Sequence, residues 1–537
     1  MTGTGLFMQL RDSLVTEYAN RDYWIPAAWL HPAGRTAVKM EDRGEVNVDP
    51  VAYYTAVLDE LDTRSDQRAP RGGLTRMTFY GALVRHLTAW RHDRCTPSAG
   101  TLLKLIALMP YLANLGVQCL YLLPLTRIGR HHAKGELGSP FAVSGIDVLE
   151  PRLHDCYLGC YDEELLKLEF AATVEAAHRY GLRVIVDFSL RTVARDCDLL
   201  GSYPENFYWV HCSGGKSLMP PHVEGIAPNS ALRLEHLSSL YAAPDLPRYM
   251  REFSVSPRLL DPARWDAVRR AGSVQDLLPR VESAFGLTTA PAFSDCINDE
   301  QAPWTDVTYL RFYDDDGPRG SGRPDSPAPY CLQDSASLNI GVREGPHAEL
   351  IECVTRVPAS WVEQFGIDGF RIDSAHALSR DINTRIVASA RDVDPACIAW
   401  GEGFSSADAD HLRASSYDLL TGTSWVPRET VEPEGMVWLG ALEIHDTARA
   451  AVVFDDSAYR SRLDWLAGNN NCCLFINAGQ ELGELRPLNM ALSPNLWRPA
   501  ASGVLGLFDY DELDWLSPRR AEYSNLLRAS AIRKRNE

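Results

Sequence analysis

Residues 366–376 read Gly-Ile-Asp-Gly-Phe-Arg-Ile-Asp-Ser-Ala-His, a short apolar run that ends abruptly in charged side chains. Ile367 and Phe370 are apolar and favour a β-strand. Arg371 and Asp373 stand two residues apart, so both side chains project from one face of that strand. A barrel of parallel strands places such a pair at its carboxyl-terminal mouth, where a cation steers an exposed carboxylate. Taken alone, the pair is equally consistent with a surface salt bridge, which contributes little to stability.

Two further carboxylates end strand-like runs downstream, in Trp400-Gly-Glu402-Gly-Phe404 and in Leu442-Glu-Ile-His445-Asp446. The ordered set Arg-x-Asp, then Glu, then His-Asp resembles the catalytic signature of the α-amylase superfamily (glycoside hydrolase family 13-like) of retaining α-glycoside enzymes. The resemblance extends from about residue 74 to about residue 520. It implies a (β/α)8 TIM barrel that acts on α-glucans without a cofactor.

The resemblance also implies a role for each residue of the set. Asp373 corresponds to the nucleophile, Glu402 to the general acid and base, and Asp446 to a carboxylate that grips sugar hydroxyls. Arg371 would keep Asp373 ionised by charge pairing, and His445 would donate to hydroxyls of the sugar at the cleavage point. Each residue taken singly could instead be a solvated loop charge.

The first motif of the family, Asp-x-x-x-Asn-His after the third strand, is altered in this chain. Asp187 matches and is expected to contact substrate, but Arg191 and Thr192 stand in the places of Asn and His. That Asn commonly helps to hold a structural calcium ion, and an arginine cannot, so no metal is expected. The absent His weakens the case for hydrolysis as the main activity.

Two more side chains are expected to contact substrate, Phe141 and His376. Phe141 lies where the family has a tyrosine segment under the sugar, although it could be a plain core residue. Glu402 needs an apolar wall to act as an acid near neutral pH. Trp400 and Phe404 flank it and could form that wall, or could belong to the core.

Within the family, three segments resemble bacterial maltosyltransferases, which move maltosyl units between α-1,4-glucans: residues 187–196, 204–209 and 293–304. Related enzymes use maltose 1-phosphate as the donor. Three cations, Arg191, Arg195 and Lys216, could therefore contact phosphate or a charged acceptor.

Those cations could also form ordinary ion pairs with nearby acidic residues, and we favour that interpretation for them. The partners would be Asp196, Asp198 and Glu205.

Strand-like and helix-like segments alternate along most of the chain, which indicates a parallel sheet or barrel. Strands are expected at 78–84, 117–123, 184–188, 367–372, 397–402, 436–443 and 472–477, with a last segment at Tyr510–Leu516. Helices are expected at 102–115, 164–180, 347–365, 379–391 and 518–534.

This alternation predicts three regions. Residues 1–73 would form a helical N-terminal extension, and residues 74–191 and 346–537 the catalytic barrel. Residues 192–345 are rich in Pro, Asp and aromatic side chains and would form an inserted subdomain over the active site, because so long a loop without structure is implausible. No C-terminal β-sandwich is evident.

The composition narrows the choice of partners. The chain has 537 residues, 45% of them hydrophobic, with 53 basic against 71 acidic residues. A net charge of -18 argues against nucleic acid and anionic membranes and suits a neutral ligand such as a maltooligosaccharide. The 12 cysteines are irregularly spaced, and the N-terminus lacks a secretory pattern, so a cytoplasmic protein with reduced thiols is expected.

The sequence therefore predicts a retaining α-glucan transglycosylase that transfers maltosyl-like units. The alternatives are an amylase-type α-glucoside hydrolase, a maltosyltransferase that depends on maltose 1-phosphate, and a non-catalytic sugar-binding protein. Neither the acceptor nor the oligomeric state follows from the sequence.

Overall fold

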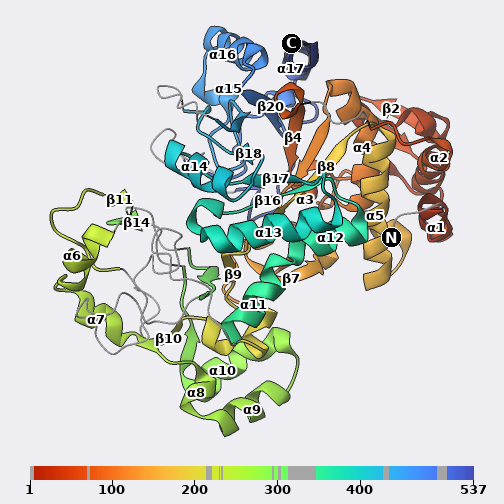
Figure 1. Ribbon diagram of the computed structural model, residues 1–537. Coiled ribbons are helices and arrows are strands. Elements are labelled where there is room, and N and C mark those ends of the chain that lie inside the picture. The colour runs from red at the N-terminus through yellow and green to blue at the C-terminus, as the bar shows by residue number, and fades with distance from the viewer. Residues whose placement is uncertain are drawn as a thin grey trace.

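Eight parallel strands close into a barrel, in the spatial order β16-β17-β18-β19-β20-β4-β5-β8, which confirms the predicted fold class (Figure 1). The computed structural model describes residues 5–68, 73–212, 220–228, 230–231, 234–292, 296–299, 304–312, 346–426, 435–492 and 505–536. In chain order the strands are β4 (Thr78–Ala82), β5 (Cys119–Leu122), β8 (Arg183–Phe188), β16 (Gly369–Ile372), β17 (Ile398–Gly401), β18 (Leu419–Leu420), β19 (Val437–Gly440) and β20 (Cys472–Asn477).

Helices cover the outside of the barrel: α4 (Leu102–Leu115), α5 (Glu163–Arg179), α11 (Pro346–Thr355), α12 (Val357–Phe365), α13 (Arg380–Val393), α14 (Ser406–Ala414), α16 (Asp456–Gly468) and α17 (Arg520–Asn536). Helix α4 has the predicted bounds, because the Thr101 hydroxyl accepts from the Lys104 N–H at its start and Gly116 adopts φ 93° at its end. The single helix predicted at 347–365 is two helices, because Pro358 in the first turn of α12 has no N–H to donate.

The sequence pattern predicts seven of the eight barrel strands. Residues 510–516 form no strand, and the missing strand is β18, between β17 and β19. Two residues are too few to show the alternation that marks a strand in sequence.

The inside of the barrel is filled with aromatic and aliphatic side chains. Phe79, Tyr121, Trp400 and Phe475 belong to one buried cluster, and the Tyr121 and Trp400 ring centroids are 4.5 Å apart. This packed layer forms the floor on which the polar side chains at the carboxyl ends of the strands rest.

The N-terminal extension is not all helical, so that prediction is wrong. Between α1 (Leu6–Asp12) and α2 (Pro50–Thr63) lies a three-stranded antiparallel sheet in the order β1-β3-β2. Its strands are β1 (Tyr23–Pro26), β2 (Val38–Asp42) and β3 (Glu45–Val48). They are short, and β2 is mostly exposed, so they show little hydrophobic periodicity in sequence.

The segment after β8 departs from the barrel and returns to it. Strand β9 (Thr192–Ala194) pairs antiparallel with β15 (Val307–Tyr309). Between them lies a sheet of β12 (Phe253–Ser254), β10 (Trp209–His211) and β13 (Leu287–Thr289), together with helices that include α10 (Leu277–Phe285). A hydrophobic cluster of its own, with Tyr208, Leu246 and Phe253, fills this part. The boundaries of the three regions stay predictions.

In the part of the chain that is described, no helix is both long and apolar enough to span a bilayer.

Candidate active site

Arg371 lies at the centre of the polar layer above the barrel floor. Its Nη1 is 2.7 Å from Asp187 Oδ2 and 2.9 Å from Asp373 Oδ1, and its Nη2 contacts Glu402 Oε1. Asp187 and Arg371 are paired in register on the neighbouring strands β8 and β16. Tyr121 on β5 donates its hydroxyl to Asp187 from below. One guanidinium thus draws together carboxylates from three consecutive strand ends.

Exposure separates the residues that hold this cluster from those that face outward. The side chains of Arg371 and Asp187 are 2% and 0% exposed, whereas those of Asp373, Glu402 and Asp446 are 18%, 10% and 15% exposed. Arg371 and Asp187 are thus buried beside the carboxylates that they position, and a contact of either with substrate stays a prediction.

A strained turn after β16 orients Glu402. Ser374 has φ 52°, an uncommon left-handed conformation for a residue with a side chain. Its N–H donates to Glu402 Oε2 at 2.7 Å. His376 lies behind this carboxylate, with its N–H donating to the carbonyl oxygen of Glu402 at 3.0 Å and its Nδ1 at 3.2 Å from the same oxygen. His376 thus fixes the backbone of Glu402, and a contact of His376 with substrate stays a prediction.

The segment after β19 brings the third carboxylate to the site. His445 Nε2 lies 3.0 Å from Asp446 Oδ2, and Asn489 Nδ2 donates to Asp446 Oδ1 at 2.6 Å. Phe141 lies flat against His445, with ring centroids 5.5 Å apart and planes 14° apart. Phe141 also belongs to the buried cluster inside the barrel, so it packs beside the site, and its contact with substrate stays a prediction.

The pKa of Asp373 is raised in this cluster, whereas the sequence led us to expect a lowered pKa. Burial and the nearby charge of Glu402 raise the pKa of Asp373 to about 8, against the opposing effect of Arg371. Arg371 pairs with Asp373 at 2.9 Å and favours its ionised form, as expected, but burial and the charge of Glu402 outweigh this effect while every carboxylate is charged. Burial opposes the charge on Asp446 as well, but His445 lowers the pKa of Asp446 and Asp446 raises that of His445.

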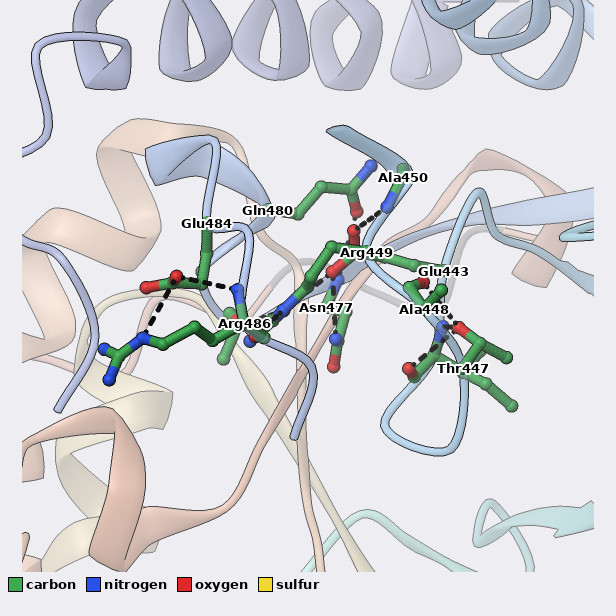
Figure 2. A network of polar contacts seen from close by, with 12 residues as sticks. Glu443, Thr447, Ala448, Arg449, Ala450, Asn477, Gln480, Glu484 and Arg486 are labelled. Atoms are coloured by element: carbon green, nitrogen blue, oxygen red, sulfur yellow. Dashed lines mark hydrogen bonds and ion pairs between the residues drawn. The ribbon is translucent and has the colours of Figure 1, made fainter. Parts of the chain in front are cut away.

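A buried ion pair fixes the segment that carries His445 and Asp446 (Figure 2). Glu443 and Arg449, both 1% exposed, are joined by a 2.7 Å contact. Arg449 also donates to the carbonyl oxygens of Ala478 at 2.8 Å and Arg486 at 2.7 Å. Glu443 accepts from the Ala450 N–H at 2.6 Å and from the Asn477 side-chain amide at 3.0 Å. The two ends of the segment are thus tied to each other and to the barrel.

Thr447 closes the inner turn of the same segment. Its hydroxyl accepts from the Ile444 N–H at 3.0 Å and lies within 3.2 Å of the Ile444 carbonyl oxygen. On the far side of the network, Glu484 accepts from the N–H groups of Leu485 and Arg486 at 2.8 and 3.0 Å. Figure 2 shows Glu443, Thr447, Glu484 and Arg486 within one network of polar contacts.

The residues of the altered first motif do not fit a calcium ion. Arg191 is buried, and its guanidinium lies 4.6 Å from the ring centroid of Tyr309 on β15. A buried cation at this place repels a metal ion, whereas calcium takes oxygen ligands.

Arg195 and Lys216 are the other two cations that were expected near phosphate. Arg195 is buried and donates to the Thr288 hydroxyl at 3.0 Å and the Thr289 carbonyl oxygen at 2.7 Å, so its predicted phosphate contact is corrected. It is hydrogen-bonded to β13 rather than paired with the acidic residues that we favoured, so that interpretation is wrong too. Lys216 lies outside the described residues.

Two segments that prompted the maltosyltransferase comparison have structural roles. The Trp209 indole N–H donates to the Pro204 carbonyl oxygen at 2.7 Å inside the insertion. Asn298 accepts from the Val223 N–H at 2.8 Å and donates to the Ile226 carbonyl oxygen at 2.8 Å, which holds a loop of the insertion. Residues 293–295 and 300–303 lie outside the described residues.

Sequence reasoning missed Tyr121, Ser374 and Asn489. Tyr121 sits in a strand whose residues all look like core, and Asn489 sits in a loop without periodicity. Trp400, considered as a wall for Glu402, lies on the barrel floor, and its indole N–H donates to the Thr421 hydroxyl at 3.1 Å. Phe404 lies against His376, with ring centroids 5.7 Å apart.

No protein-family model matches the chain. Among curated proteins, it is similar to an alpha-1,4-glucan:maltose-1-phosphate maltosyltransferase of Cereibacter sphaeroides, at 33% identity over 124 residues, or 20% of this chain and 19% of that protein. A second such enzyme, from strain ATCC 17023 of this organism, is 32% identical over 124 residues, which are 20% of this chain and 17% of that protein. The match thus spans less than a fifth of the length of these relatives.

Solved structures similar to the chain include a noncanonic maltogenic alpha-amylase of Thermotoga neapolitana, at 17% identity and a TM-score of 0.49, covering 86% of this chain and 77% of that one. An alpha-amylase of Lactobacillus plantarum is 17% identical, with a TM-score of 0.48, and the match covers 86% of this chain and 80% of that one. The structural neighbours of the chain are thus α-amylase-family enzymes, and over about a fifth of its length its sequence is similar to maltosyltransferases.

Proposed function

We propose that this protein is a retaining α-glucan transglycosylase that transfers a maltosyl-like unit between α-1,4-glucans. The observation that carries the proposal is the position of Asp373 and Glu402 at the ends of neighbouring strands, bridged by the buried Arg371. Two carboxyl groups that flank one bond are the requirement for retaining glycoside chemistry. The sequence match to maltosyltransferases supports the choice of transferred unit.

In the proposed reaction, Glu402 protonates the leaving oxygen while Asp373 attacks the anomeric carbon and forms a glycosyl-enzyme. An acceptor hydroxyl, deprotonated by Glu402, then displaces Asp373. The cluster must hold one proton at the start of this cycle, and the raised pKa of Asp373 shows that the site resists carrying every negative charge at once. When the proton is on Glu402, the repulsion on Asp373 falls and Arg371 pairs with the ionised nucleophile.

Asp446 and His445 would grip hydroxyl groups of the donor sugar. Asn489 holds Asp446 in place, and Phe141 supports the imidazole of His445 from behind. Such pre-positioning reduces the entropic cost of reaching the transition state.

The test is incubation of the full chain with maltotetraose, with and without phosphate, followed by chromatography of the products and a reducing-end assay. Transfer predicts longer and shorter products spaced by two glucose units, with nearly constant reducing ends. If reducing ends rise as fast as the donor disappears, the protein is an α-glucoside hydrolase. Inert protein that still binds maltooligosaccharides would instead be a non-catalytic sugar-binding protein.

Dependence on maltose 1-phosphate is the second candidate, because both curated relatives carry that substrate in their names. Its test is the same incubation with maltose 1-phosphate as the donor. Release of inorganic phosphate that requires the glucan acceptor would favour it, and chain extension without any phosphate compound would exclude it.

A further inference from the structure

We propose a zinc site between the barrel and the insertion, formed by His131, His132 and Glu282. Their potential ligand atoms, one imidazole nitrogen from each histidine and a carboxylate oxygen, all lie within 4.8 Å of one another. The inference does not depend on the proposed function, and no part of the sequence pattern pointed to it.

The three residues come from separate parts of the chain. His131 and His132 lie in the connection from β6 (Thr126–Ile128) to β7 (Val143–Leu149), which also carries Phe141, and Glu282 lies on helix α10 of the insertion. His132 has φ 63°, and this left-handed backbone lets two adjacent imidazoles turn toward one carboxylate, with ring centroids 5.1 Å apart.

The distances suit a metal better than direct ion pairs. His131 Nε2 is 3.4 Å from Glu282 Oε2, and His132 Nε2 is 3.2 Å from Oε1. A charge-assisted hydrogen bond is shorter, about 2.7–2.9 Å. Zinc bonds of about 2.0–2.2 Å in a tetrahedron place ligand atoms about 3.3–3.5 Å apart. The two nitrogen–oxygen separations, one to each oxygen of the carboxylate, are therefore longer than such hydrogen bonds and close to the edge length of a tetrahedral site.

The surroundings of these residues resemble a supporting shell. The Thr288 hydroxyl donates to Glu282 Oε1 at 2.6 Å, and Arg195 donates to that hydroxyl at 3.0 Å. Asp196 Oδ2 accepts from the His131 N–H at 2.9 Å and from the N–H of the preceding residue at 2.9 Å. Groups that hold ligands in this way are a regular part of zinc sites.

Two imidazoles and a carboxylate favour zinc over calcium or magnesium, which prefer oxygen ligands. Three protein ligands leave a fourth position for water. A metal here would tie the loop that carries Phe141 to the insertion, so it would stiffen one side of the candidate active site.

The experiment uses the full chain, stripped with a chelator and dialysed, and titrates it with Zn²⁺, Ca²⁺ or Mg²⁺ in a calorimeter and in thermal melts. We expect one equivalent of Zn²⁺ to bind and to raise the Tm, with no such effect from Ca²⁺ or Mg²⁺. His131→Ala and Glu282→Gln should each weaken zinc binding by at least about 100-fold, and Thr288→Val by about 10- to 100-fold. The matched control His222→Ala, at an exposed histidine of the insertion, should bind like wild type.

Co²⁺ distinguishes this site from the exposed cysteines, which also bind soft metals. Histidine and carboxylate ligands give visible d–d bands without the strong near-ultraviolet band of thiolate ligands. That thiolate band, or zinc affinity within about threefold of wild type in both ligand variants, would overturn the proposal. Absence of zinc binding by wild type would also overturn it and leave the histidines as hydrogen-bond donors to Glu282. Melts without metal check that each variant folds, and His132→Gln replaces His131→Ala if that variant does not.

Discussion

Replacement of Arg449 by methionine should destabilise the protein and disturb the candidate active site together. The methionine keeps the apolar stem of the side chain and removes the guanidinium. It leaves Glu443 as a buried charge that has lost its 2.7 Å partner, and the carbonyl oxygens of Ala478 and Arg486 lose a donor each.

Removal of one partner of a buried ion pair costs about 3–5 kcal/mol, because the remaining charge is not compensated. Glu443 keeps its hydrogen bonds from the Ala450 N–H at 2.6 Å and the Asn477 side chain at 3.0 Å. The expected loss of folding free energy is therefore at the lower end of this range, about 3 kcal/mol. The segment anchored by this pair carries His445 and Asp446. A displacement of about 1 Å there would lower kcat by about 100-fold.

The assay compares urea midpoints and kcat for Arg449→Met with those for Arg460→Met. Arg460 pairs with Glu522 on the surface, at 46% and 55% exposure, where such a pair contributes about 0.2–1 kcal/mol. A double variant, Glu443→Gln with Arg449→Met, should lose less stability than the sum of its two single variants, because no buried charge remains. If Arg449→Met matches Arg460→Met in both midpoint and kcat, the positioning role of the pair is refuted.

Three further predictions concern the carboxylates. Asp373→Ala should abolish turnover while the fold and maltooligosaccharide binding persist, and wild-type activity in this variant would contradict the nucleophile assignment. Glu402→Gln should lower activity on maltooligosaccharides by about 100- to 10,000-fold, with a smaller loss for formation of the intermediate from a glycosyl fluoride; equal losses would argue against an acid role. Because the pKa of Asp373 is raised to about 8 in the folded state, the folded protein binds the extra proton and wild type loses stability as pH rises toward 8. The Tm advantage of Asp373→Asn over wild type should therefore widen between about pH 4 and 8 and then level off, and a constant advantage would show that the pKa is not raised.

Much of the barrel could be predicted because its helices and long strands are locally encoded. Helix α4 has a Thr cap, an apolar face and a terminal Gly, and β20 (Cys472–Asn477) is a continuous apolar run. Strand β18 and the N-terminal sheet could not be predicted, because so few residues pair and their register depends on partners distant in sequence.

The order of the three carboxylate motifs was likewise present in the sequence, and it led to the candidate site. Contacts between distant segments decided the rest. The sequence could not show that Arg371 serves three carboxylates at once, or that burial and the charge of Glu402 raise the pKa of Asp373 against the effect of Arg371.

The sequence by itself determined the strand and helix rhythm and which residues stand at strand ends, because propensity, caps and periodicity act over a few neighbouring residues. Only the tertiary structure decided which charges are buried and which face solvent. It also brought His131 and His132 to Glu282, which is about 150 residues away in sequence. Burial and Coulomb interactions depend on three-dimensional distance, and a closed barrel brings residues from every part of the chain to one rim.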